Sequence, residues 1–262
     1  MAQRSKIRFL DFIHPPWGRI HFTRNDTLFM SGEVILIIFQ VAILIMSVVI
    51  HEVAHGVMAL KLGDPTAKYA GRLTLNPINH FDLWGSFIVP FFMIITFNFG
   101  FGWAKPVPYN PYNLRDQKKG PAWVALAGPA SNIITAIIFA IGAKFIPLSY
   151  SSKLDIASNM FNFNELGILL SGSFAAIFFW LFVMILTINV FLAVFNLIPI
   201  PPLDGSKLLF AFTNISEQKK MAMEQYGFIV LLFFIFFLSA PLGYFLSFIL
   251  SLFFKYIVGI TI

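Results

Sequence analysis

The sequence contains no cysteine, which excludes disulfides and thiolate metal sites. Any metal must therefore be held by His, Asp or Glu side chains. Charge is also scarce: 11% of the residues are charged, against about 25% in soluble proteins. With 58% hydrophobic residues and a mean hydropathy of +0.80, the chain has more apolar surface than its core can bury. We therefore expect an integral membrane protein surrounded by a lipid bilayer.

Acidic residues are fewer than basic ones, 12 against 18, which gives a net charge of +6. The basic residues do not form a stripe. They gather in the short polar stretches between apolar runs, as membrane topology requires. This distribution argues against nucleic acid as a partner.

Four apolar stretches are long enough to cross a bilayer as helices, since a crossing needs about 20 residues. The sequence therefore predicts an all-α membrane protein, a polytopic helical bundle with four to six spans. Residues 1–32 are expected to form a polar interfacial leader, and residues 33–262 a single transmembrane domain. The four stretches are 34–62, 121–146, 169–198 and 228–254.

Three segments are ambiguous. The apolar stretch 86–102 is barely long enough to span, and a re-entrant segment is the alternative. Residues 228–262 form either one segment or two shorter ones that break near Pro241. Residues 67–75 read as a short strand pair: either an edge that adds a substrate strand, or a plain interfacial β-hairpin.

Charge asymmetry predicts the orientation. With four spans and a re-entrant segment, one side holds residues 61–120 and 199–227, which carry ten Lys and Arg residues. The other side carries seven, outside the spans. Because cytoplasmic loops are enriched in Lys and Arg, the side with ten is expected to be cytoplasmic.

The segment His51-Glu52-Val53-Ala54-His55 is the strongest chemical signal. Histidines four residues apart lie on one helix face and can bind one zinc ion, with the glutamate as the base that activates its water. The segment follows a long apolar run, and ionisable groups in spanning helices are by default functional. The sequence therefore predicts a metal site inside the bilayer, about 15 Å before Lys61.

A third ligand must come from elsewhere in the chain. Asp204 follows a long apolar helix that the prolines of residues 199–202 interrupt, and irregular backbone at such depth lines a cavity or packs inside protein. Asp204 is therefore the candidate, although it also suits the N-cap of a following helix.

Asn132 and Asn196 are polar residues in apolar helices. They are candidates for binding the substrate backbone or for orienting the metal ligands. Hydrogen bonding between helices is the alternative.

These motifs together resemble the site-2 protease family of intramembrane zinc metalloproteases, in its compact branch without a PDZ domain. The resemblance covers about residues 45–210. It is carried by HEVAH at 51–55, PPLDG at 201–205, and the segments 71–77, 102–108 and 127–132.

The resemblance implies one Zn²⁺ per chain held by His51, His55 and Asp204, with Glu52 as catalytic base. It implies regulated intramembrane proteolysis: hydrolysis of a peptide bond in or near a transmembrane helix of a membrane-protein substrate. It also implies a bacterial cytoplasmic membrane and an active site that faces the cytoplasm. Substrate, regulatory partner and oligomeric state stay open.

Two other functions are possible for a membrane protein with this His pair. A zinc transporter needs further intramembrane ligands to pass the ion along. The apolar segments contain no such ligands beyond His51, Glu52, His55 and Asp204. A scaffold that binds membrane helices without cutting them has no need for the base Glu52.

Overall fold

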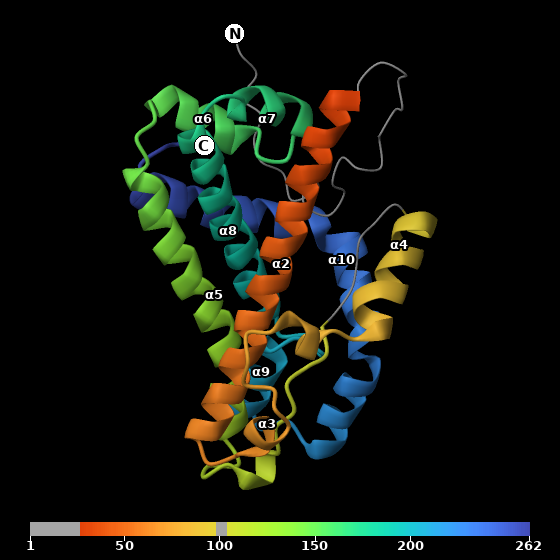
Figure 1. Ribbon diagram of the computed structural model, residues 1–262. Coiled ribbons are helices and arrows are strands. Elements are labelled where there is room, and N and C mark those ends of the chain that lie inside the picture. The colour runs from red at the N-terminus through yellow and green to blue at the C-terminus, as the bar shows by residue number, and fades with distance from the viewer. Residues whose placement is uncertain (1–26, 98–103) are drawn as a thin grey trace.

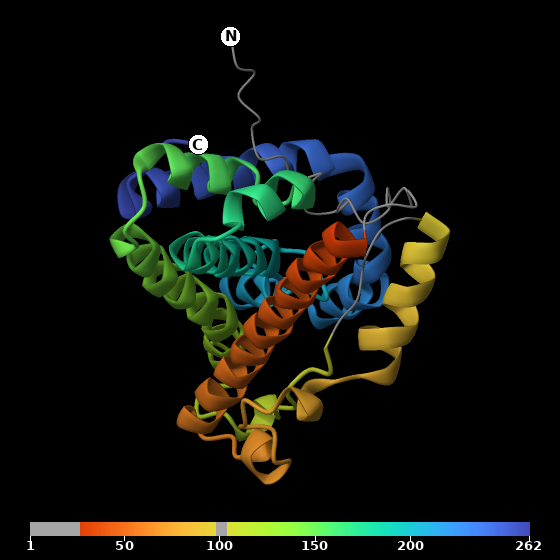
Figure 2. The same cartoon turned by 45° about the horizontal axis from the view of Figure 1, so that its top comes forward.

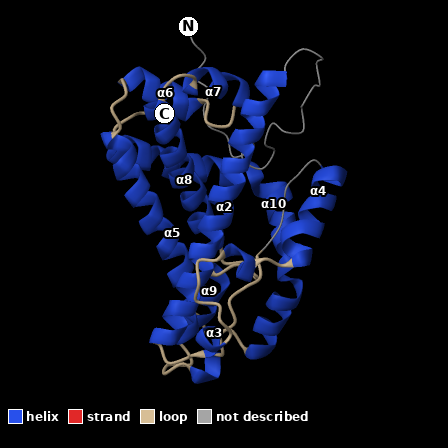
Figure 3. Cartoon of the chain, in the orientation of Figure 1, coloured by secondary structure: helices blue, strands red, loops and turns tan. Residues whose placement is uncertain are grey.

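The computed structural model describes residues 27–97 and 104–262, and these form helices joined by loops (Figure 3). The longer helices build a bundle, and short ones occupy its two ends (Figure 1). The α-helices are α2 (Thr27–Lys61), α3 (Thr66–Tyr69), α4 (Val89–Phe97), α5 (Gly120–Phe145), α6 (Tyr150–Ser158), α7 (Phe163–Leu170), α8 (Phe174–Asn196), α9 (Gly205–Phe212) and α10 (Glu217–Phe253). Short 3₁₀ or π turns are η2 (Pro77–His80), η3 (Trp84–Ile88), η4 (Pro111–Asn113) and η5 (Phe254–Val258).

Four helices in the described part of the chain are long and apolar enough to cross a membrane, as the sequence predicted. They are Val34–Lys61 of α2, α5, α8, and the run Glu217–Val258. Helix α2 begins at Thr27, inside the stretch expected to be a polar leader. Residues 1–26 of that leader lie outside the described residues.

The helices α2, α5 and α8 form the centre of the bundle (Figures 1 and 2). Ala136, Ala140 and Ala143 are fully buried along one face of α5. Small residues at this spacing let helix backbones approach closely. In a membrane, helices associate through such close packing, because the hydrophobic effect does not drive them together in lipid. The main core joins this face to buried residues of α6, α7, α8 and α10.

The expected strand pair at residues 67–75 is wrong. Residues Thr66–Tyr69 form helix α3, and no strand occurs in residues 27–97 and 104–262. Asp64 Oδ1 accepts the Thr66 N–H, which favours the first helical turn. Gly71, at φ +64°, ends the helix: its N–H and that of the next residue donate back to the carbonyls of Lys68 and Ala67. This pair of bonds is a Schellman cap, a local signal that outweighs a loose alternation of apolar residues.

The apolar stretch 86–102 begins within η3 and continues directly into α4, which is described as far as Phe97. Residues 98–103 lie outside the described part. The ends of the segment meet, since the Lys105 N–H donates to the His80 carbonyl at 2.9 Å. Residues 80 and 105, which flank the segment, are therefore neighbours in space. Whether it dips into a membrane there stays a prediction.

The last long helix bends. Leu238 in α10 has non-helical angles (φ −113°, ψ 16°), three residues before Pro241. A proline inside a helix removes one backbone hydrogen bond and clashes with the preceding turn, which accounts for the bend. Beyond it, α10 runs across the end of the bundle where α6 and α7 lie (Figures 1 and 2). Buried Leu250, Phe254 and Val258 join the main core there.

Candidate metal centre

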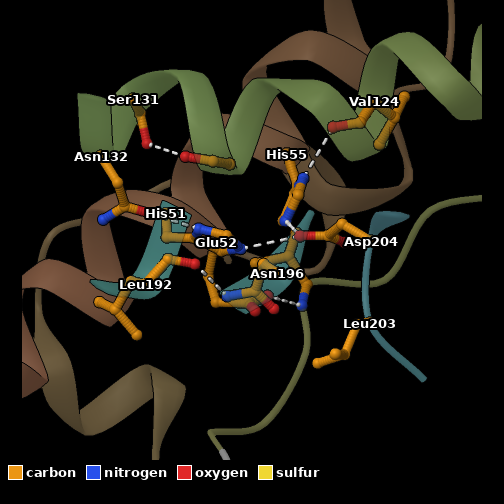
Figure 4. A network of polar contacts seen from close by, with 12 residues as sticks. His51, Glu52, His55, Val124, Ser131, Asn132, Leu192, Asn196, Leu203 and Asp204 are labelled. Carbon is orange, nitrogen blue, oxygen red and sulfur yellow. Dashed lines mark hydrogen bonds and ion pairs between the residues drawn. The ribbon is translucent and has the colours of Figure 1, made fainter. Parts of the chain in front are cut away.

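His51 and His55 lie one turn apart on α2, and both imidazoles point to the same oxygen. His51 Nε2 is 3.0 Å from Asp204 Oδ2, and His55 Nε2 is 3.2 Å from it (Figure 4). The side chains of the two histidines are 7% and 11% exposed, and that of Asp204 18%. The structure thus brings together three residues that span more than 150 positions of the sequence.

Asp204 reaches the histidines because the chain between α8 and α9 doubles back. Gly205 lies so close to the end of α8 that an added Cβ would stand 2.2 Å from the Leu197 carbonyl oxygen. Only glycine fits there. Asp204 precedes α9 as its N-terminal flanking residue but makes no side-chain cap bond, so its carboxylate is free for the histidines.

The outer nitrogens of both rings are bonded to oxygen. His55 Nδ1 lies 2.7 Å from the Val124 carbonyl oxygen, which can only accept, so Nδ1 is the donor. His51 Nδ1 lies 2.5 Å from Asn132 Oδ1, the amide oxygen, which also accepts. In neutral imidazoles, both Nε2 atoms then carry a lone pair that faces a carboxylate oxygen.

Lone pairs on two nitrogens facing a carboxylate need a cation between them. Ligand atoms of a tetrahedral zinc ion lie about 3.3 Å apart, close to the two nitrogen–oxygen distances observed. Two imidazole nitrogens and a carboxylate fit zinc, and the outer hydrogen bonds are those that orient metal-bound histidines.

Gly128 of α5 makes room for the histidine pair. A Cβ at this position would lie 2.5 Å from His55 Nε2 and 2.6 Å from His51 Cε1. The absence of a side chain lets α5 pack directly against the two rings and bring Asn132 and Val124 to their outer edges.

A buried polar network extends behind His51. Asn132 Nδ2 donates to Asn189 Oδ1 of α8 at 2.7 Å, and Asn189 Nδ2 donates to Ser47 Oγ of α2 at 2.9 Å. Asn132 and Asn189 are fully buried. The network ties the three central helices together at the depth of His51, and Asn132 joins it to the His51 ring. The role of Asn132 in orienting a ligand stays a prediction.

The sequence analysis missed Asn189. Its only local signal was an amide in an otherwise apolar helix, the same signal that singled out Asn132 and Asn196. Asn196 lies differently: its Nδ2 donates to the Leu192 carbonyl of its own helix at 2.9 Å. Its part in binding substrate stays a prediction.

Glu52 lies beside the histidines. One ligand atom from each of His51, Glu52 and His55 lies within 4.8 Å of the others, a group that could hold a metal ion. Glu52 Oε2 accepts the Val107 backbone N–H at 2.8 Å. The Glu52 carboxylate is therefore close enough to act on a molecule bound to a metal ion held there, and one of its oxygens accepts a hydrogen bond from the loop that follows residue 104.

Comparison with known proteins agrees with this geometry. Residues 39–240 match the model of peptidase family M50. The chain is 35% identical over 205 residues to "Putative zinc metalloprotease YwhC" of Bacillus subtilis, covering 78% of this chain and 83% of that protein. It is 27% identical over 214 residues to "Putative zinc metalloprotease Rip2" of Mycolicibacterium smegmatis, covering 81% and 72%. No solved structure matches the chain.

Proposed function

Since the chain belongs to peptidase family M50, the site-2 protease family, we propose that it hydrolyses peptide bonds in or near transmembrane helices of membrane-protein substrates. The main support is the meeting of His51, His55 and Asp204 beside Glu52, inside a bundle of apolar helices. We propose one zinc ion per chain, held by these three ligands.

The proposed chemistry divides among few residues. A bound zinc ion supplies a Lewis acid that polarises the scissile carbonyl and makes water more acidic. Glu52 takes the proton of the attacking water and delivers it to the leaving amine. Asn132 and the Val124 carbonyl hold the imidazoles with Nε2 turned inward. Asn196 is proposed to contact the substrate backbone.

The arrangement of the chain in the membrane is the second part of the proposal. The ends of the segment 81–104 meet at the His80–Lys105 hydrogen bond, which supports a re-entrant loop rather than a fifth span. Such a loop is tolerated where protein surrounds it. We propose that residues 33–262 form one protease domain, in a bacterial cytoplasmic membrane, with the metal near the cytoplasmic side.

The experiment that tests the proposal replaces the base. Glu52→Gln, purified in detergent, is expected to retain zinc and to lose at least about 100-fold of the cleavage rate on a model transmembrane substrate, because general base catalysis is removed. Zinc content and cleavage are measured on the same samples. Glu165→Gln is the matched control, since Glu165 is exposed on α7 at the other end of the bundle.

Normal cleavage by Glu52→Gln would contradict the protease function. Uptake of zinc by vesicles that contain the wild-type protein, without cleavage, would instead favour a transporter.

A further inference from the structure

The segment Lys105–Asn110, which we name the strap, crosses the face of α2 that carries Glu52. Its contact with the candidate base is a single backbone hydrogen bond, from the Val107 N–H to Glu52 Oε2 at 2.8 Å. The strap has neither helical nor strand structure. Its sequence and anchors indicate a function beyond connecting two helices.

The strap can present only one donor at this place. Pro106 and Pro108 flank Val107, and a proline has no backbone N–H. Prolines also fix φ and hold the preceding residue in extended backbone, which stiffens the strap. The Val107 N–H is therefore the sole backbone donor of residues 106–108, held by a rigid frame.

Both ends of the strap are anchored. Upstream, the Lys105 N–H donates to the His80 carbonyl at 2.9 Å, and Arg72 Nη2 donates to the Lys105 carbonyl at 2.7 Å. His80 and Arg72 are 1% and 7% exposed, so this clamp is buried. Downstream, the Asn110 N–H donates to Asp64 Oδ2 at 2.6 Å, just past the end of α2.

Gly56 provides the surface on which the strap rests. A Cβ at Gly56 would lie 2.9 Å from Val107 Cγ1 and 2.6 Å from Leu73 Cδ2. Gly56 follows Glu52 by one helical turn, so it lies on the same face of α2. With no side chain there, the strap comes close enough to α2 for its N–H to reach the carboxylate.

We propose that the strap positions the catalytic base: the Val107 N–H holds one oxygen of Glu52 and leaves the other to accept the proton. The inference rests on the proposed function and deepens it. A glutamate has three rotatable side-chain bonds, so an anchor on one oxygen selects the orientation in which the other faces the reacting water. Val107 acts through Glu52 and does not touch the substrate in this role.

Hydrogen exchange tests the contact without any activity measurement. Because both flanking residues are prolines, overlapping peptides across 106–108 report the Val107 amide alone. In Glu52→Ala we expect this amide to exchange about tenfold faster or more, since a hydrogen bond to a charged acceptor is lost. In wild type and in the control Glu165→Ala it stays slow. Equal rates in wild type and Glu52→Ala would overturn the inference.

Kinetics test the consequence. Val107→Pro removes the N–H and keeps the extended backbone, whereas Val107→Ala keeps the N–H and loses the packing on Gly56. We expect Val107→Pro to bind zinc normally and to lose about 10- to 100-fold in kcat with little change in KM. The loss in Val107→Ala is expected to be several-fold smaller.

A kcat for Val107→Pro equal to or above that of Val107→Ala, in folded and zinc-loaded protein, would overturn the positioning role. An increase over wild type would show that the strap restrains Glu52 instead. If wild type cleaves no membrane substrate, the proposed function fails, and the exchange rates still decide whether the strap holds Glu52.

Discussion

His51 Nδ1, on the side of the ring away from Asp204, donates a buried hydrogen bond to Asn132 Oδ1. The orientation of the His51 ring therefore depends on Asn132 as well as on the ligand position. Asn132→Leu leaves that N–H without an acceptor in a buried place. We expect the zinc affinity to fall about 10- to 100-fold, the usual cost of losing such an outer partner. Competition with a chelator measures it.

Asn189→Leu is expected to weaken zinc binding less, since Asn132 retains its bond to His51. Thr135→Val, one turn along α5, is the control, because the Thr135 hydroxyl donates to the carbonyl of Ser131 in its own helix. Unchanged zinc affinity in Asn132→Leu would remove Asn132 from the site.

Gly128→Ala tests how closely α5 must approach the two rings. The new methyl group would overlap both imidazoles, so the rings must move apart and we expect zinc affinity to fall about tenfold or more. Gly142→Ala in the same helix overlaps only the Phe182 ring. It should lower thermal stability and leave zinc affinity unchanged, and equal zinc affinities for the two variants would contradict the steric argument.

At the scale of elements, Asp64 joins the end of α2 to the loop that carries the strap. Its carboxylate accepts hydrogen bonds from the hydroxyl and the N–H of Thr66, from the side-chain amide of Asn113 and from the N–H of Asn110. Burial alone raises the pKa of Asp64, but these hydrogen bonds outweigh it and hold that pKa below the ordinary 3.8. Asp64→Ala leaves buried donors unpaired, and we expect it to lower the stability of this end of the bundle by about 1–3 kcal/mol.

The pH dependence of that loss has a definite sign. Because the folded-state pKa lies below the unfolded value of 3.8, the stabilisation is fully present above pH 3.8 and is lost as the pH falls through the folded pKa. Thermal unfolding of wild type and Asp64→Ala should therefore converge in acid. A difference that stays constant down to the lowest measurable pH would contradict this account.

These elements also show how far sequence reasoning reaches. The long helices and the His51–His55 pair follow from local patterns, hydropathy and a four-residue spacing, so they could be predicted. The Asn132–Asn189 bond and the strap on Glu52 join positions 57 and 55 apart, and no local pattern records such pairings. The prediction of a strand pair at 67–75 was wrong because the Asp64–Thr66 hydrogen bond and the cap at Gly71 stabilise a helical turn that the apolar alternation does not reveal.

At the scale of the whole molecule, the loops divide between two ends of the bundle. Residues 62–80, 105–119 and 197–216 lie at the end of the bundle where α2 ends, and α6 and α7 lie at the other end (Figure 1). The Lys and Arg count predicts that the first of these ends faces the cytoplasm and that the end with α6 and α7 faces the exterior. The chain has no cysteine, so a single introduced thiol can be located without background.

Asn214→Cys and Asn164→Cys form a matched pair on exposed asparagines at opposite ends. In intact bacterial cells, a membrane-impermeant maleimide should label Asn164→Cys and leave Asn214→Cys unlabelled until the cells are permeabilised. The reverse pattern would place the metal site towards the exterior. Equal labelling of both in intact cells would contradict four spans with these loops on opposite sides.

The distance along the chain between His55 and Asp204 has a consequence for biosynthesis. Ribosomes add about 5–20 residues per second, so the two histidines are made roughly 7–30 s before the carboxylate that faces them. During that interval the nascent chain carries an incomplete ligand set beside other newly inserted helices. Because Asp204, the third proposed ligand, follows the third long helix, the proposed zinc site can be completed only after most of the chain has been synthesised.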